Sequence, residues 1–380
     1  MAFDFDAPTN RLGSDSIRWD SFDSKKVLPL WVADMDFQSP PCVIEAVSKR
    51  AQEGIYGYTH SPAQFNHMIA QYLVEQYQWK IDPDWIVILP SVVSGLYTAV
   101  QQLTQIDQSV LVPSPVYHHL KLACTESGRQ VQDMPMQLKA GRWVMPDSLD
   151  SLINNKTRLA LLCNPQNPGS TVFTKEELQS FGDFCIQNQL WICSDEIHAG
   201  LVLDEKKKHI PLASVSQAIS QRTVTLMSLN KTFNFPGTGL AWAIAENPQL
   251  RKAMKVGLHQ TIAPPNLFAY TATVSAITHG DPWRQELIQY LRVNRNLIHT
   301  AIQTIDPLSI AAMEGSYLAW IDCSQLNHPN PHQLFLDAGL ATSPGSQFGR
   351  PKFVRLNFGT QKTRVKQALE IIRTACQQIQ

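Results

Sequence analysis

The feature that most constrains the fold is a series of short apolar runs separated by helix-like stretches between residues 48 and 281. The runs, rich in valine, isoleucine and leucine, are 85–89, 109–113, 158–163, 190–195, 223–228 and 240–245. They lack strict alternation of apolar and polar residues, which is typical of strands whose two faces are both covered by helices. Alternating strands and helices predict an α/β domain built on a mostly parallel sheet.

The pattern changes at both ends of the chain. Residues 1–47 are rich in Asp, Ser and Pro and show little periodicity, whereas 282–304 predicts one long amphipathic helix. Three further elements follow, which are strand-like runs at 316–323 and 352–359 and a closing helix at 364–379. We therefore predict a large α/β domain over 48–281, and a smaller α+β domain made of 282–380 together with 1–47 as an N-terminal arm.

Charge and hydropathy exclude several classes of protein. Lys and Arg number 32, and so do Asp and Glu, so the chain has no basic field for nucleic acid or an anionic membrane. No stretch is long and apolar enough to span a bilayer, and the first residues lack the regions of a signal peptide. The seven cysteines show no C-x-x-C spacing. We expect a cytoplasmic globular protein with reduced thiols.

Chemically distinct groups follow the predicted strands, and ligands of open α/β sheets bind beyond the carboxyl ends of strands. After 85–89, a turn opens a helix whose free N–H groups form an anion site. The groups after later strands are Tyr117, the amides Asn164 and Asn167 in the stiff turn "NPQNPGS", the carboxylate Asp195, and Lys231. Ordinary turns and packed side chains explain each one separately. Together they are the groups needed to hold a phosphorylated, planar, nitrogen-containing aldehyde and to bond it covalently.

Two pairs of residues also raise the possibility of a metal site. His118 and His119 are adjacent, so on a helix they point in different directions. Asp195 and His198 have a spacing that suits ligands, but no third ligand stands near them in the sequence. We therefore predict no metal site.

The order of the motifs resembles the fold-type I pyridoxal 5'-phosphate (PLP) enzymes of the aminotransferase class I/II superfamily. Within it, the chain resembles the cystathionine β-lyase (C–S lyase) group of the MalY/PatB type. The motifs are "WVADMDF" (31–37), "YGYTH" (56–60), "NPQNPGS" (164–170), "SDEIH" (194–198), "SLNKTFN" (228–234) and "FVRLNFG" (353–359). "WVADMDF" and "SDEIH" are the most specific, because general aminotransferases usually have D-E-x-Y. The resemblance covers nearly the whole chain.

The resemblance implies a role for each matching residue. Lys231 would bond the aldehyde of PLP and act as catalytic base, Asp195 would pair with the ring nitrogen, and Tyr117 would stack on the ring. The other implied cofactor contacts are Asn167 and His198 near the ring oxygen, the N–H groups of Val92 and Val93 with the Ser228 hydroxyl at the phosphate, and Tyr58 from a neighbouring subunit. A homodimer is therefore part of the implication.

The substrate side of the implied site centres on Arg355. The resemblance implies that it binds the substrate α-carboxylate, for which a planar guanidinium is well suited. Considered by itself, an arginine in this strand is explained slightly better by a structural salt bridge. The implied activity is cleavage of L-cystathionine or another S-substituted cysteine to a thiol, pyruvate and ammonia.

The chain departs from the superfamily pattern at several positions. Gly239 stands where transaminases commonly carry an arginine that grips the phosphate, and the lyase group also tends to lack that arginine. Gly200 stands where the family often has an acidic residue, and "NPQNPGS" and "FGRPKF" differ from the usual turn sequences. Two alternatives stay open, an aminotransferase on the same scaffold and a PLP-binding regulatory protein.

Overall fold

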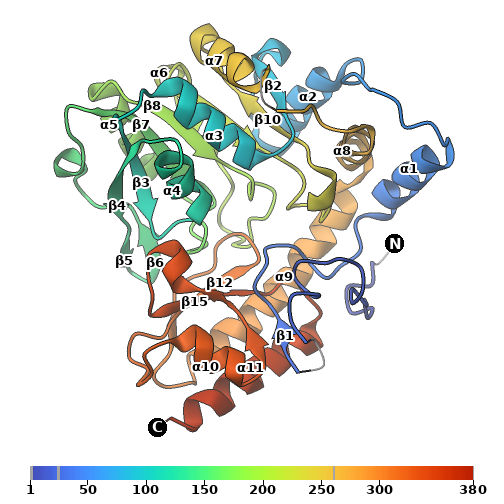
Figure 1. Ribbon diagram of the computed structural model, residues 1–380, viewed down its shortest axis with the longest axis vertical. Helices are drawn as coiled ribbons and strands as arrows, with labels where there is room; N and C mark the ends of the chain where they lie inside the picture. The colour runs from blue at the N-terminus through green and yellow to red at the C-terminus, as the bar shows by residue number, and fades with distance from the viewer. Residues whose placement is uncertain (1–2, 24–25, 260–261, 380) are drawn as a thin grey trace.

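A seven-stranded sheet forms the centre of the larger part of the molecule (Figure 1). The structure is a computed structural model that describes residues 3–23, 26–259 and 262–379. The strands, in sheet order, are β2 (Ile86–Leu89), β10 (Ala241–Ile244), β9 (Thr223–Met227), β8 (Trp191–Asp195), β7 (Thr157–Cys163), β3 (Ser109–Ser114) and β4 (Gln130–Pro135). The six apolar runs of the sequence therefore all form strands of one sheet.

Helices cover both faces of this sheet. In β3, Val110 and Val112 pack into one apolar cluster, while the intervening Leu111 packs into another. The first cluster lies under α3 (Val92–Leu103), α4 (His118–Thr125) and α7 (Pro248–His259), and the second under α5 (Lys175–Gln187) and α6 (Gln217–Ser220). Burial on both sides is the reason that the strands read as continuous apolar runs. The predicted α/β fold with helices on both faces is confirmed.

The direction of β10 differs from that of its neighbours. The sheet is mostly parallel, as predicted, but β10 runs antiparallel to both β9 and β2. The connection from β9 to β10, residues 228–240, contains only the short turn η4 (Pro236–Thr238). Two parallel neighbours would need a longer crossover, which is usually an α-helix. This connection has no such helix, so the chain turns back and β10 runs antiparallel to β9. The edge strand β4 was not predicted, because its sequence "QVQDMP" is largely polar and most of its side chains face solvent.

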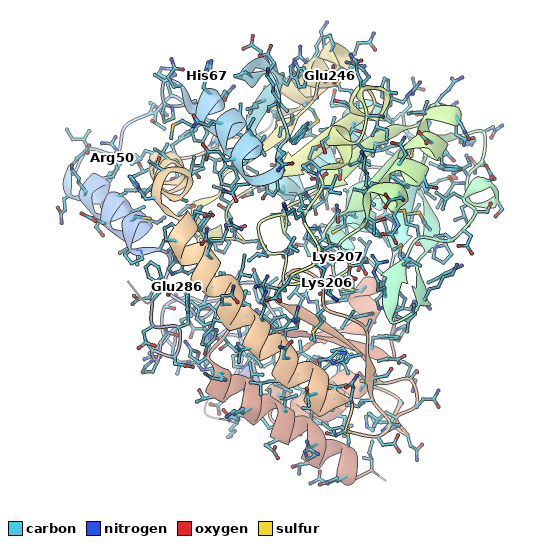
Figure 2. All side chains as sticks on the ribbon, turned by 180° about the vertical axis from the view of Figure 1, so that it is seen from behind. Arg50, His67, Lys206, Lys207, Glu246 and Glu286 are labelled. Atoms are coloured by element: carbon cyan, nitrogen blue, oxygen red, sulfur yellow. The ribbon has the colours of Figure 1, made fainter. Side chains whose placement is uncertain are left out.

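A four-stranded antiparallel sheet forms the smaller α+β part. Its strands, in order, are β11 (Ser309–Ile310), β12 (Leu318–Asp322), β15 (Phe353–Asn357) and β14 (Ser343–Pro344). Its helices are α10 (Pro331–Asp337), α11 (Lys362–Gln377) and the long α9 (Asp281–Ile302). Seen from behind, α9 runs from the larger part toward the smaller one and ends beside α11 (Figure 2). The domain boundaries at residues 47/48 and 281/282 stay a prediction.

The N-terminal region joins the two parts. β1 (Leu28–Pro29) pairs in parallel with β13 (Leu340–Ala341), so the N-terminal chain lies against the small domain. The remaining elements are α1 (Pro41–Gln52), α2 (Phe65–Tyr77), α8 (Leu267–His279) and the hairpin β5 (Gln137–Lys139) and β6 (Arg142–Val144). The prediction that residues up to 47 are irregular was wrong for its end, because α1 begins at Pro41 with prolines at its start. In the described ranges, no helix has both the length and the apolar character needed to cross a bilayer.

Candidate functional site

A cavity of about 430 Å³ lies where the carboxyl ends of β3, β7, β8 and β9 face the small domain. It is bounded by residues from both sheets and from the N-terminal segment. The predicted site residues that line it are Val92, Val93, Tyr117, Asn167, Asp195, His198, Ser228, Lys231 and Arg355. Its size suits a bound small molecule. These residues lie as far apart in sequence as Val92 and Arg355, so the cavity forms only when the chain packs into its tertiary structure.

Lys231 follows β9 and contacts the N-terminal segment across the cavity. Its Nζ donates a hydrogen bond to the Ala33 carbonyl oxygen at 2.5 Å. Burial lowers the pKa of Lys231 to about 8, the nearby Arg355 lowers it as well, and Asp34 and Asp195 act in the opposite direction. An amine with a pKa this close to neutrality loses its proton readily and becomes a nucleophile or base.

Asp195 ends β8 and is buried. Its Oδ1 accepts a hydrogen bond from the Ile197 N–H at 3.1 Å, and no cation lies within ion-pair distance among the described residues. Burial raises the pKa of Asp195 to about 6, although the Ile197 N–H opposes the shift. A buried carboxylate without a counter-ion is costly. A ligand with a positively charged nitrogen would supply the missing partner.

Arg355 lies in β15 and also lacks an anionic partner in the described part of the chain. Its Nη1 donates to Asn167 Oδ1 at 3.1 Å, and its Nη2 donates to the Trp31 carbonyl at 3.0 Å and to Ser343 Oγ at 3.1 Å. The buried Nε has no partner, and the guanidinium lies 4.8 Å from the centre of the Phe348 ring. Burial lowers the pKa of Arg355 to about 10. Since its partners are neutral, the structural salt bridge considered from sequence is absent from the described residues.

The amide, aromatic and imidazole groups of the site form its walls. Asn167 accepts the Tyr117 N–H on its backbone oxygen at 3.0 Å, which binds the turn after β7 to the turn before α4. Tyr117 lies just before α4 and lines the cavity, and burial raises the pKa of its hydroxyl. Burial, Lys231 and Arg355 lower the pKa of His198 to about 3, so this imidazole is neutral, and its Nδ1 has no partner.

The predicted anion cradle is the N-terminus of α3. Ser91 caps the helix by accepting the Ser94 N–H at 3.0 Å, which leaves the N–H groups of Val92 and Val93 without partners in the described structure. Ser228 lines the same cavity, but its hydroxyl donates to the Leu240 carbonyl at 2.6 Å and must rotate to bind a ligand.

Gly239 lies near this cradle but does not line the cavity. It adopts a φ of +66°, and an added Cβ would lie 3.2 Å from the Pro90 carbonyl oxygen. Residues with side chains rarely adopt this conformation. An arginine at this position would therefore be strained in the backbone conformation seen here.

Two sets of residues differ from expectation. Tyr58 is fully exposed on the segment after α1 and lies outside this cavity. Several lining residues had no role assigned from sequence, namely Trp31, Val32, Ala33, Asn230, Ser343, Gln347 and Phe348. The first three belong to "WVADMDF", whose specificity as a motif was the available signal. In the described ranges, no group of three or more His, Cys, Asp or Glu side chains is arranged to hold a metal ion.

The sequence and the fold have clear counterparts among known proteins. The family model described as aminotransferase class I and II matches residues 25–372, and the chain belongs to this family. It is 32% identical to cystathionine beta-lyase PatB of Bacillus subtilis strain 168, over 98% of this chain and 99% of that protein. The relationship predicted from the motifs is confirmed.

Solved structures agree with this assignment. The crystal structure of OvoB is 37% identical, with a TM-score of 0.96, and the match covers 98% of this chain and 99% of that chain. Cystalysin from Treponema denticola, solved with a pyridoxal 5'-phosphate cofactor, is 26% identical with a TM-score of 0.95 and covers 100% of both chains.

Proposed function

We propose that this chain is a PLP-dependent carbon–sulfur β-lyase that cleaves L-cystathionine or another S-substituted cysteine to a thiol, pyruvate and ammonia. The observation that carries the proposal is a set of three ionisable groups around one cavity, the buried Asp195 and Arg355 and the partly buried Lys231, which the described chain leaves without ion-pair partners. The 32% identity to cystathionine beta-lyase PatB over 98% of the chain supports the same chemistry.

The residues of the cavity fit PLP. Asp195 would face the ring nitrogen and keep it protonated, and Lys231 would bond the aldehyde carbon. The unpartnered N–H groups of Val92 and Val93 would receive the phosphate at the start of α3, where the helix dipole also favours an anion. Tyr117 would lie against the ring. When bound, PLP supplies an electron-accepting ring that stabilises negative charge on the substrate Cα.

The side chains then have distinct tasks in elimination. Arg355 would bind the substrate α-carboxylate, because its charge is unused and its Nε is free. When the substrate amine takes its place on the aldehyde carbon, Lys231 would be released as a free amine and would take the Cα proton, since its lowered pKa makes the neutral amine accessible near neutral pH. The Ala33 carbonyl, which contacts Lys231 Nζ at 2.5 Å, would stabilise the resulting ammonium. Neutral His198, in the place of the transaminase tyrosine, adds no charge beside the ring.

The reaction type can be tested directly. We expect about one pyruvate and one ammonia per L-cystathionine consumed without any added keto acid, because elimination requires no amino-group acceptor. Pyruvate and ammonia should be measured with and without 2-oxoglutarate. Product formation that depends strictly on 2-oxoglutarate, with glutamate as a product, would identify an aminotransferase instead. Absence of both reactions on a range of S-substituted cysteines would favour a PLP-binding regulatory protein.

We also propose that the enzyme is a homodimer in which Tyr58 reaches the phosphate site of the neighbouring subunit. Tyr58 is fully exposed, and on the same segment Ile55 and Tyr56 are exposed by 76% and 61%. Clustered exposed apolar side chains of this kind mark an interaction surface. The three residues lie outside the cavity of their own chain, so a contribution of Tyr58 to a site requires a second subunit.

Mixing two impaired variants tests this arrangement. We expect Lys231→Ala and Tyr58→Ala each to be strongly impaired alone, and activity to be partly restored after the subunits are exchanged. A hybrid dimer contains one site that has both Lys231 and the partner's Tyr58. Sedimentation velocity should show a dimer throughout. A monomeric protein, or mixtures that never exceed the sum of the separate activities, would refute the proposal.

A further inference from the structure

The carbonyl oxygens of residues 29–37, which we call the carbonyl segment, are bound mainly by side chains, whereas the N–H groups of Leu30 and Asp36 bind the backbone oxygens of Ala341 and Gly359. Each of its carbonyl oxygens accepts at least one hydrogen bond, although only its first residue lies in a strand. The side-chain donors are Arg18, Ser343, Arg355, Asn357, Lys231, Tyr317, Asn234, Arg11, Thr9 and Gln361, and the N–H of Asn357 binds the Leu30 oxygen. A segment bound in this way has a defined position without belonging to a sheet.

Two oxygens of the carbonyl segment orient the cations of the candidate site. The Trp31 oxygen accepts Arg355 Nη2 at 3.0 Å, and the Ala33 oxygen accepts Lys231 Nζ at 2.5 Å. The Ala33 oxygen also accepts the Tyr317 hydroxyl at 2.9 Å. A shift of the segment would therefore change the positions of both Arg355 and Lys231.

Arg18 is fully buried and binds the carbonyl segment on both sides of Trp31 and Ala33. Its Nε donates to the Pro29 oxygen at 2.7 Å, and its Nη1 donates to the Asp34 oxygen at 3.0 Å. Its Nη2 lies 3.1 Å from Asp36 Oδ2. Trp31 and Ala33 lie between these anchors, so one guanidinium sets the span that presents their oxygens. Arg18 does not line the cavity.

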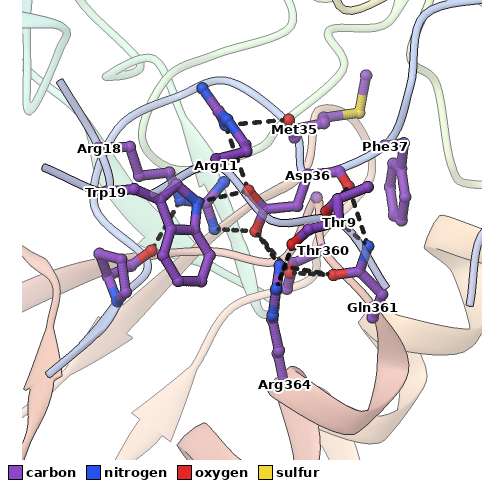
Figure 3. A network of polar contacts seen from close by, with 12 residues as sticks. Thr9, Arg11, Arg18, Trp19, Met35, Asp36, Phe37, Thr360, Gln361 and Arg364 are labelled. Atoms are coloured by element: carbon purple, nitrogen blue, oxygen red, sulfur yellow. Dashed lines mark hydrogen bonds and ion pairs between the residues drawn. The ribbon is translucent and has the colours of Figure 1, made fainter. Parts of the chain in front are cut away.

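Asp36 is the centre of a polar network that supports Arg18 (Figure 3). Trp19 Nε1 donates to Asp36 Oδ1 at 2.8 Å, and Arg11 and Arg364 each lie 3.2 Å from the carboxylate. Burial alone would raise the pKa of Asp36, but Arg18 and these neighbours hold it below its ordinary value. Buried ion pairs are weak contributors to stability, because desolvation offsets their attraction. We therefore infer that these ion pairs serve mainly to fix the position of the Arg18 guanidinium.

We propose that Arg18 is a positioning residue of the active site, which orients Lys231 and Arg355 through the carbonyl segment without touching substrate or cofactor. A lysine at this position keeps the positive charge but loses the branched set of donors, because one ammonium cannot reach Pro29, Asp34 and Asp36 together. The carbonyl segment would then loosen while the carboxylate of Asp36 stays paired.

The test compares Arg18→Lys with the matched control Arg364→Lys. Arg364 shares Asp36 with Arg18; it also hydrogen-bonds Thr9 and Gln361, and its guanidinium lies 4.5 Å from the centre of the Trp19 ring. We expect Arg18→Lys to raise the KM for an S-substituted cysteine about tenfold, the effect of weakening one hydrogen bond to a charged group. Arg364→Lys should leave KM within about twofold of wild type, because it does not touch the span from Pro29 to Asp34.

A second measurement does not depend on turnover. In the cofactor-free full chain, Lys231 should react faster with an amine-reactive reagent in Arg18→Lys than in wild type, as measured by mass spectrometry. Loss of the Ala33 contact frees the amine and removes an acceptor that stabilises its protonated form. Arg364→Lys should match wild type. The KM measurement relies on the proposed function, whereas the labelling measurement does not, so failure of one is distinguishable from failure of the other.

The outcomes are decisive in either direction. Unchanged labelling of Lys231 in a folded Arg18→Lys protein would overturn the proposal, and so would equal changes in Arg364→Lys. If Arg18→Lys does not fold, Arg11→Lys takes its place, since the half-buried Arg11 holds Met35, Asp34 and Asp36 from the other side. Arg11→Lys should raise KM and speed the labelling of Lys231, both by less than expected for Arg18→Lys. Wild-type values of both in Arg11→Lys would overturn the proposal.

Discussion

Replacement of Lys231 by alanine is expected to abolish covalent capture of PLP and to lower turnover by at least about 10⁴-fold, because nucleophile and general base are lost together. Wild-type protein should be yellow, and borohydride should fix the cofactor permanently to the chain. The variant should still bind PLP through the other walls of the cavity, but borohydride should leave the cofactor removable by denaturation. Absorbance spectra and intact mass before and after reduction measure both effects.

A second lysine serves as the control for this variant. Lys121 is partly buried and pairs with Asp133 at 2.5 Å, and it does not line the cavity. Lys121→Ala should keep the yellow colour, the reducible cofactor and the turnover of wild type. A Lys231→Ala protein that still gained the mass of reduced PLP would show that another residue bonds the cofactor.

Substitution of Asp195 by asparagine is expected to lower turnover about 10²- to 10³-fold while leaving most of the bound PLP in place, as is typical when one electrostatic stabiliser is removed. Asparagine keeps the shape of the side chain and removes the charge proposed to hold the ring nitrogen protonated. The proposed phosphate contacts at the start of α3 would not involve Asp195 and should retain the cofactor. Cofactor content per subunit and turnover per bound cofactor should be measured together.

The adjacent Glu196 provides a matched control for Asp195. It is equally buried, but it pairs with His209 Nε2 at 2.7 Å and accepts the Leu212 N–H at 3.0 Å, away from the cavity. Glu196→Gln should lower the melting temperature, because a buried network is broken, and leave turnover per bound cofactor near wild type. Equal losses of cofactor and turnover in Asp195→Asn would mean that Asp195 has a mainly structural role.

Local features of the fold were predictable because they depend on neighbouring residues. The apolar runs that form the strands can be seen within windows of a few residues. The helix α5 is a clear case, since Thr174 and Glu177 form the capping box that their spacing indicates. The residues at the ends of β8 and β9 followed from the same reasoning, which identified Asp195 and Lys231 as members of one binding surface.

Other features depend on contacts that no local pattern encodes. The reversed direction of β10 follows from the path of a loop, and the close approach of the Pro90 carbonyl oxygen to Gly239 arises only in the folded chain. Arg355 belongs to a different sheet from Asp195 and Lys231, so its proximity to them could be inferred only from a family resemblance. The pattern of a strand predicts on which face of the sheet a side chain lies, but it does not predict which other part of the chain packs against that face.

The sequence by itself determined most of the strands and helices, although not β4 or α1, together with the groups at the strand ends and the family, because propensity, periodicity and motif spacing are local properties. The tertiary structure alone decided how these groups act. It buried Asp195 and Arg355 and partly buried Lys231 with no counter-ion within ion-pair distance among the described residues, which shifts the pKa of each of them. It also placed the carbonyl segment between Arg18 and the cavity, since Lys231 and Ala33 meet although they lie 198 residues apart. Burial and long-range contact arise only when the whole chain packs.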